Sequence, residues 1–136
     1  MRIVLDTNVL ISAFLFEKRL GKIVKLIEQG GITPCFLITT FQEFRRVLAY
    51  EKFKPLLETA HTSVGEIIER LYAHSVILED PEIIPDATAD APDNYILAAA
   101  QSANAQCVVT GDKLLLALKR FNKIPIIKPE QFLRDF

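Results

Sequence analysis

The chain opens with Met1-Arg2-Ile3-Val4-Leu5-Asp6-Thr7-Asn8, and this stretch decides both the fold and the place to look for chemistry. Its first five residues are apolar except for Arg2, which predicts a short buried β-strand. Asp6 follows directly, and a carboxylate at the end of a buried strand is costly to desolvate unless it faces a crevice or a cation. Thr7 and Asn8 add a hydroxyl and an amide beside it. We interpret Asp6 as one wall of a metal site, with Thr7 and Asn8 as supporting polar groups.

Composition bounds the class of protein. The 136 residues predict one domain, 1–136, with a sizeable core, and 50% hydrophobic with 24% charged residues is typical of a globular chain. The net charge of −1 provides no overall basic field, so a polyanion would have to be held by a local patch or a metal. Cys35 and Cys107 lie in apolar stretches without zinc-site spacing, which predicts buried thiols. With no apolar run near the ~20 residues that span a bilayer, and no signal-peptide pattern, we expect a cytoplasmic protein without a membrane partner.

Apolar strands alternate with helical segments along the rest of the chain. Further strands are expected at 34–38, 75–78, 107–110 and 124–127, and helices at 9–14, 20–29, 39–49, 55–74 (interrupted near Gly65), 92–104, 112–120 and 129–136. The connections are long enough for parallel crossovers. The pattern therefore predicts a three-layer α/β/α sandwich around a central parallel five-stranded sheet. Ligands bind such sheets at the carboxyl ends of the strands.

Four acidic residues are expected at that edge of the sheet. Asp6 and Asp112 follow the first and fourth strands, Glu43 lies one turn into the helix after the second, and Asp93 opens the helix that leads to the fourth. A crossover helix runs antiparallel to its strands, so its first turn lies at their carboxyl ends. Asp90, one turn earlier, is a further candidate.

Each acid taken singly also fits a structural role. Asp6, Asp93 and Asp112 are placed to cap or to begin helices. Thr40 to Glu43 reads as a capping box, with Glu43 at the third helical position.

Taken together, the four acids favour a metal centre. Two carboxylates about 4 Å apart repel by roughly 4 kcal/mol at an effective dielectric of 20, so a rim of four must separate, share protons or bind a cation. Oxygen ligands without a nearby His or Cys indicate Mg²⁺ or Mn²⁺. Such ions activate water and clamp phosphodiesters, and helix N-termini suit a phosphate. The constellation is that of a metal-dependent nuclease.

The motifs around these acids resemble a known family. They are Ile3–Ser12, Glu43–Leu48, Asp93–Ala98 and Val109–Leu115, with Pro129–Leu133 near the end of the chain. They resemble PIN-domain ribonucleases over nearly the full length, and most closely the PIN-family toxin components of toxin–antitoxin systems. The opening motif is the most specific of them.

The resemblance implies a Mg²⁺- or Mn²⁺-dependent endoribonuclease that hydrolyses RNA phosphodiester bonds, with a cognate antitoxin protein as partner and a homodimeric state. It implies a catalytic and metal-binding quartet, supported by Thr7, Asn8 and Thr110; the quartet is Asp6, Glu43, Asp93 and Asp112. Many relatives carry a denser acid run where this chain has Asp90-Ala91-Pro92-Asp93. A second metal position, with Asp90 as a ligand, therefore stays open.

Other residues and functions also stay open. Arg45, Arg46 and Lys113 are candidates for phosphate contacts, with a solvated helix face as the alternative. One alternative function is a catalytically inactive PIN-like binding scaffold in which the acids are structural. Another is a receiver-like phosphoacceptor signalling domain, which Lys128-Pro129 fits and the single Asp after the first strand does not.

Overall fold

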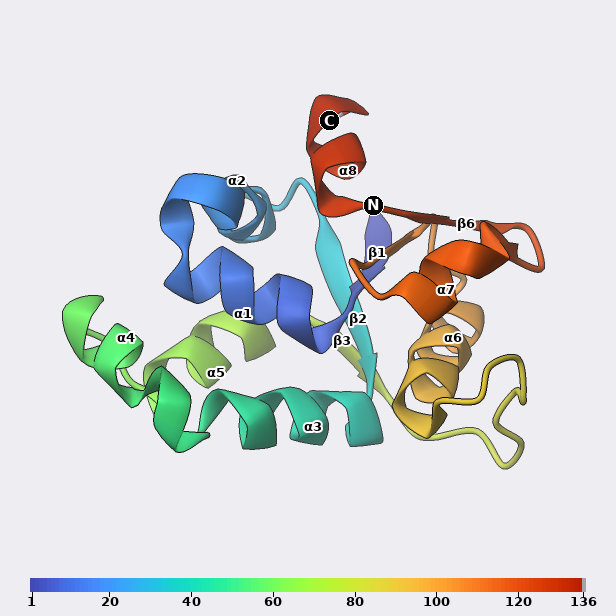
Figure 1. Cartoon of the computed structure of the whole chain (residues 1–136), viewed down its shortest axis with the longest axis horizontal. Helices are drawn as coiled ribbons and strands as arrows, with labels where there is room; N and C mark the ends of the chain where they lie inside the picture. The colour runs from blue at the N-terminus through green and yellow to red at the C-terminus, as the bar shows by residue number, and fades with distance from the viewer. Residues whose placement is uncertain (136) are drawn as a thin grey trace.

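A central sheet separates two layers of helices in the computed structural model, which describes residues 1–135 (Figure 1). Within these residues the strands are β1 (Arg2–Leu5), β2 (Thr33–Leu37), β3 (Val76–Leu78), β4 (Val108–Val109), β5 (Arg120–Phe121) and β6 (Ile124–Ile127). They lie in the order β3-β2-β1-β4-β6-β5, and all neighbours are parallel except β5 and β6. The predicted α/β/α class is confirmed.

The sheet has six strands where five were predicted. The additional strand is β5, which forms an antiparallel hairpin with β6. Its first residue was assigned to the preceding helix, but Lys119 adopts φ 63°, so that helix ends at Leu118. Asn122 turns the hairpin at φ 55°, a conformation that asparagine tolerates well. Strand β5 has two residues and one of them is Arg120, so it shows no apolar run from which a strand could be predicted.

The helices are α1 (Thr7–Leu15), α2 (Glu17–Glu28), α3 (Ile38–Leu48), η1 (Glu51–Phe53), α4 (Lys54–Thr59), α5 (Val64–Tyr72), α6 (Ala91–Ala103), α7 (Lys113–Leu118) and α8 (Pro129–Asp135). Phe136, the last residue of the predicted terminal helix, lies outside the described residues. The break predicted near Gly65 falls between α4 and α5, because the Ser63 hydroxyl caps α5 by accepting from Glu66 N. No helix within residues 1–135 is long and apolar enough to cross a bilayer.

The capping box predicted for the third helix is wrong. Helix α3 begins at Ile38, which was assigned to the strand, and Thr40 is its third residue. The Thr40 hydroxyl accepts from Leu37 N at 2.9 Å, so it satisfies the start of the helix by itself. Glu43 is therefore the sixth residue of α3, and capping does not explain its presence.

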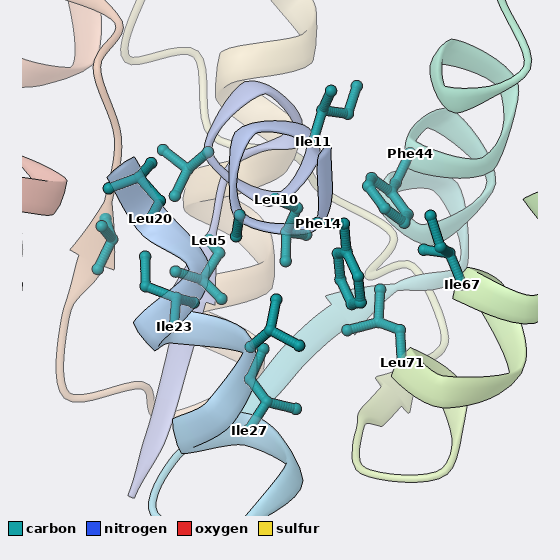
Figure 2. Close-up of a cluster of buried hydrophobic side chains, with 14 of the residues drawn as sticks. Leu5, Leu10, Ile11, Phe14, Leu20, Ile23, Ile27, Phe44, Ile67 and Leu71 are labelled. Atoms are coloured by element: carbon teal, nitrogen blue, oxygen red, sulfur yellow. The ribbon is translucent and has the colours of Figure 1, made fainter. Parts of the chain in front are cut away.

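Alternate residues of each central strand supply two separate cores. Ile3 and Leu5 of β1 pack against α1, α2, α3 and α5, whereas Val4 packs against α6 and α7. Figure 2 shows the first core, where Leu10 and Phe14 of α1 meet the buried faces of α2, α3 and α5. Burial on both faces explains the uninterrupted apolar runs of these strands.

The strand order changes direction beside β1. The chain runs from β1 through β2 to β3 on one side, then returns through α6 to β4 on the other side. The connections that leave the carboxyl ends of β1 and β4 go to opposite faces of the sheet, α1 to one and α7 to the other. Parallel α/β sheets bind ligands at such a switch point. Asp6 follows one of these strands and Thr110 the other.

Candidate metal centre

A pocket of about 250 Å³ opens at this switch point. We call it the carboxylate pocket, and its lining residues are Asp6, Thr7, Asn8, Thr40, Glu43, Asp90, Pro92, Asp93, Ile96 and Asp112. The structure thus brings together the predicted acidic quartet, Asp90 and two of the three supporting polar residues. A larger hollow of about 760 Å³ lies between α1, α2 and α4, but no carboxylate among the described side chains lines it.

Asp6 is held in place by the start of its own helix. It is 8% exposed and caps α1, with Oδ1 accepting from Val9 N at 3.0 Å and Oδ2 accepting from the Thr110 hydroxyl. Burial raises the pKa of Asp6, the bonds from Thr110 and Val9 lower it, and the nearby Asp112 carboxylate raises it. The net direction is upward. The capping role and the pocket position are compatible, because both belong to the same side chain.

Thr110 joins two of the acids. Its hydroxyl donates to Asp6 Oδ2 and accepts from Asp112 N at 2.9 Å, and the residue is fully buried. Asp112 in turn caps α7, with Oδ1 accepting from Leu114 N at 2.8 Å and Leu115 N at 3.2 Å. The predicted supporting residue therefore lies beneath the pocket, where it fixes the spacing of Asp6 and Asp112.

Replacing Thr110 with Val is expected to lower the free energy of unfolding by about 1–3 kcal/mol, because the shape is kept while Asp6 and the amide of Asp112 lose a buried partner. It is also expected to raise the pKa of Asp6 further, since the bond from Thr110 lowers it. Urea unfolding measures the first effect. Thr110→Ser is the matched control and should regain most of the loss; a Val variant as stable as the parent would contradict this role.

Asp93 carries the strongest sign of an incomplete site. It is 8% exposed, and its Oδ2 is buried without a hydrogen-bond partner among residues 1–135. Burial and the neighbouring carboxyl groups of Asp112, Asp90 and Asp6 raise the pKa of Asp93 to about 7. An unpartnered buried carboxylate oxygen is unfavourable. The atom therefore lies where a cation would satisfy it.

The remaining acids are held less tightly. Asp90 caps α6, with Oδ1 accepting from Asp93 N at 2.9 Å, so it lies directly against Asp93. The Glu43 carboxylate is 26% exposed and 3.7 Å from Arg46. Arg45, Arg46 and Lys113 do not line the carboxylate pocket in the described structure, although Arg46 approaches it through Glu43. Their predicted contact with phosphate therefore stays a prediction.

Two polar residues near the pocket were missed from the sequence. Thr40 lines it and fixes the first turn of α3, as described above. Asn94 is buried under the 79–90 loop, where Oδ1 accepts from Thr88 N at 2.9 Å and Nδ2 donates to Thr88 O at 3.1 Å. Thr88 in turn accepts from Asp90 N at 3.1 Å. An asparagine directly after Asp93 was the available signal, since a buried amide needs backbone partners.

The chemistry of the pocket fits a hard divalent cation. It offers mainly carboxylate oxygens, one of them orphaned, and burial together with their mutual repulsion raises the pKa of Asp93. No group of three or more His, Cys, Asp or Glu side chains in the described residues is spaced to hold an ion as it stands. The carboxylates would have to draw together around one. Asp6 and Asp112 are fixed by backbone amides, so Asp93 and Glu43 are the side chains left to move.

Fold and pocket together define an α/β protein with an acidic centre at the switch point of its sheet. The family model described as "PIN domain" matches residues 2–114. The chain therefore belongs to the PIN domain family, whose members are generally nucleases. A comparison with curated proteins finds no match.

Among solved structures the chain is similar to one described as VapBC2 from Rickettsia felis bound to a DNA fragment from their promoter. The TM-score is 0.59 at 15% sequence identity, and the alignment covers 94% of this chain and 98% of the other. At that identity the likeness shows the fold. It agrees with the family match over the elements that build the pocket.

Proposed function

We propose that this protein is a divalent metal-dependent endoribonuclease that hydrolyses RNA phosphodiester bonds. The observation that carries the proposal is the convergence of Asp6, Glu43, Asp93 and Asp112 on one pocket, with Asp93 Oδ2 buried and unpartnered in the described structure. Membership of the PIN domain family supports nuclease chemistry. The metal would be Mg²⁺ or Mn²⁺, because the pocket offers oxygen ligands without His or Cys.

Each acid has a role that follows from how it is held. Asp6 and Asp112 would be fixed ligands, since backbone amides and Thr110 orient them. Asp93 would present its free oxygen to the ion, and Glu43 would either bind it or orient the attacking water. When bound, the ion would supply an activated water and neutralise charge on the phosphate. A second ion near Asp90 remains part of the proposal.

The helix starts around the pocket would favour the substrate. Helices α1, α6 and α7 begin at Asp6, Asp90 and Asp112, so the positive ends of three helices surround the acids. Helix N-termini attract anions. They would offset part of the repulsion between the carboxylates and a phosphate.

A toxin role and an antitoxin partner belong to the same proposal. The support is the likeness to the VapBC2 structure, whose description names a complex bound to promoter DNA, together with the motif resemblance. A homodimer and a cytoplasmic location are proposed on the same basis.

The receiver-like alternative loses its support. Its sheet order would be 2-1-3-4-5, whereas β4 adjoins β1 here, and the chain belongs to another family. The inactive scaffold remains the second candidate, because the acids as they stand are not spaced to hold an ion in the described residues.

The deciding experiment incubates the purified full-length chain with labelled RNA in Mg²⁺, in Mn²⁺ and in EDTA, alongside calorimetric titration with Mn²⁺. We expect cleavage with either metal, none in EDTA, and saturable Mn²⁺ binding. Absence of Mn²⁺ binding at millimolar concentration, together with intact RNA, would favour the scaffold.

A further inference from the structure

A basic groove runs along α2. It has a volume of about 630 Å³ and is formed by α1, α2 and the end of α5. We call it the α2 groove; its cationic residues are Lys18, Arg19, Lys22, Lys25 and Arg70, and Glu28 is the acid among its described lining residues. This concentration of positive charge stands out in a chain whose net charge is −1.

The groove's lysines face away from the core because of helical spacing. Leu20, Ile23 and Ile27 are buried in the first core, where Figure 2 shows them beneath α2. Lys18, Lys22 and Lys25 are spaced at i, i+4 and i+7 and are exposed. At 1.5 Å per residue they extend over about 10 Å of the helix surface.

These three lysines are also the uncompensated charges of the groove. Arg19 pairs with Glu130 at 2.7 Å and Arg70 pairs with Glu28 at 2.7 Å. Lys18, Lys22 and Lys25 form no ion pair among the described side chains. A row of exposed lysines is often only a solvated helix face. The position of these lysines relative to the carboxylate pocket argues for a role in binding.

A second groove shares lining residues with both the α2 groove and the carboxylate pocket. It has a volume of about 420 Å³, and its lining includes Asn8, Arg19, Lys128 and Glu130, the acid that pairs with Arg19. Asn8 also lines the carboxylate pocket, and Arg19 also lines the α2 groove. The three hollows thus follow one another through shared lining residues, from the acids past Arg19 and Lys128 to the lysines of α2.

We propose that the α2 groove binds the phosphate backbone of a single-stranded RNA whose segment to be cleaved lies in the carboxylate pocket. The inference rests on the nuclease function proposed above. A pocket of carboxylates attracts no polyanion without its metal, so cations farther along the strand must supply the affinity. A positively charged groove that follows the backbone is how proteins hold single strands without reading sequence. A flexible single strand can follow two connected grooves.

The test measures binding separately from cleavage. Fluorescence anisotropy with a labelled 20-nucleotide mixed-sequence single-stranded RNA is recorded in EDTA, over a range of NaCl concentrations. The test variant is Lys18→Gln/Lys22→Gln/Lys25→Gln in the full-length chain. The matched control, Lys119→Gln/Arg120→Gln/Lys123→Gln, removes three charges from the α7–β5–β6 region at the other edge of the sheet.

The test variant is expected to bind RNA at least about tenfold more weakly at 100 mM NaCl, and its log–log salt slope should fall by about 2, because each lost contact with a single strand is worth about 0.7. The control should stay within twofold of the parent. The triple Arg variant at 18, 22 and 25 should bind like the parent, which separates lost charge from lost folding.

Two results would overturn the inference: parental RNA binding by the Gln variant, or an equal loss of binding in the control. If the Gln variant binds RNA like the parent but no longer binds poly-glutamate, the groove is instead a site for an acidic protein segment. The two proposals fail separately. If the protein cleaves RNA and the Gln variant binds RNA like the parent, only the proposed role of the α2 groove is wrong. If RNA binding depends on the lysines but no metal supports cleavage, only the proposed nuclease function is wrong.

Discussion

Asp6→Asn is expected to abolish RNA cleavage while the protein stays folded. We expect the rate to fall by on the order of a hundredfold or more, since even partners of a metal ligand are worth ten- to hundredfold. Asparagine is as good a helix cap as aspartate, so its carbonyl can still accept from Val9 N. Its amide can donate to the Thr110 hydroxyl oxygen, which already accepts from Asp112 N and has a second lone pair for this bond.

The same substitution should leave stability unchanged or raise it. Burial and the Asp112 charge both raise the pKa of Asp6, so the ionised form is unfavourable in the folded state without metal. Thermal melting in EDTA measures this effect, and calorimetry with Mn²⁺ should show weakened binding. Asp135→Asn, an exposed acid at the end of α8, is the charge-matched control and should cut RNA like the parent. Parental cleavage by Asp6→Asn would rule out the proposed mechanism.

Asp93→Asn is expected to change how stability depends on pH. Burial and the neighbouring carboxyl groups raise the pKa of Asp93 from its ordinary value of 3.8 to about 7 in the folded protein. Between these values the folded state binds more protons than the unfolded state, so the free energy of unfolding falls as pH rises through this window. Above pH 7 the free energy of unfolding lost in this way is on the order of a few kcal/mol. Asparagine does not ionise, so the Asp93→Asn variant does not lose this stability.

The measurement compares the two proteins across pH in metal-free buffer. The parent should lose stability relative to Asp93→Asn from pH 5 to pH 8, and the variant should be the more stable of the two at pH 8. Addition of Mg²⁺ at pH 8 should raise the melting temperature of the parent more than that of the variant, because the ion takes the place of the proton. A difference between the two proteins that does not vary with pH would show that Asp93 is ionised normally.

The layer arrangement and the positions of the four acids at the strand ends could be predicted from the sequence, because each depends on local patterns. Buried strands show uninterrupted apolar runs, and an acid at the end of a strand is visible without any tertiary information. Membership of the PIN domain family and the three-layer fold are confirmed. The roles of the four acids as ligands remain predictions.

Features that depend on tertiary contacts could not be predicted in this way. The edge strand β5 exists through its pairing with β6. The predicted start of α3 was wrong. The Thr40 hydroxyl accepts from Leu37 N, so the helix begins at Ile38 and Glu43 lies beyond its first turn. The position of the α2 groove relative to the acids could not be predicted from the sequence. It depends on Asn8, Arg19 and Lys128, which are distant in the chain and come together only in the folded structure.

The strand order determines when, during synthesis of the chain, the carboxylate pocket can first form. Asp6 is made well before its partner Thr110 and the acid Asp112, which follow β4, and the neighbour of β4, strand β6, ends only at Ile127. A growing chain on the ribosome therefore carries the early acids without the wall that closes the pocket. Domains generally fold as units, so assembly of the centre awaits the synthesis of β6. A nuclease centre built in this order would be inert until that strand has been made and paired.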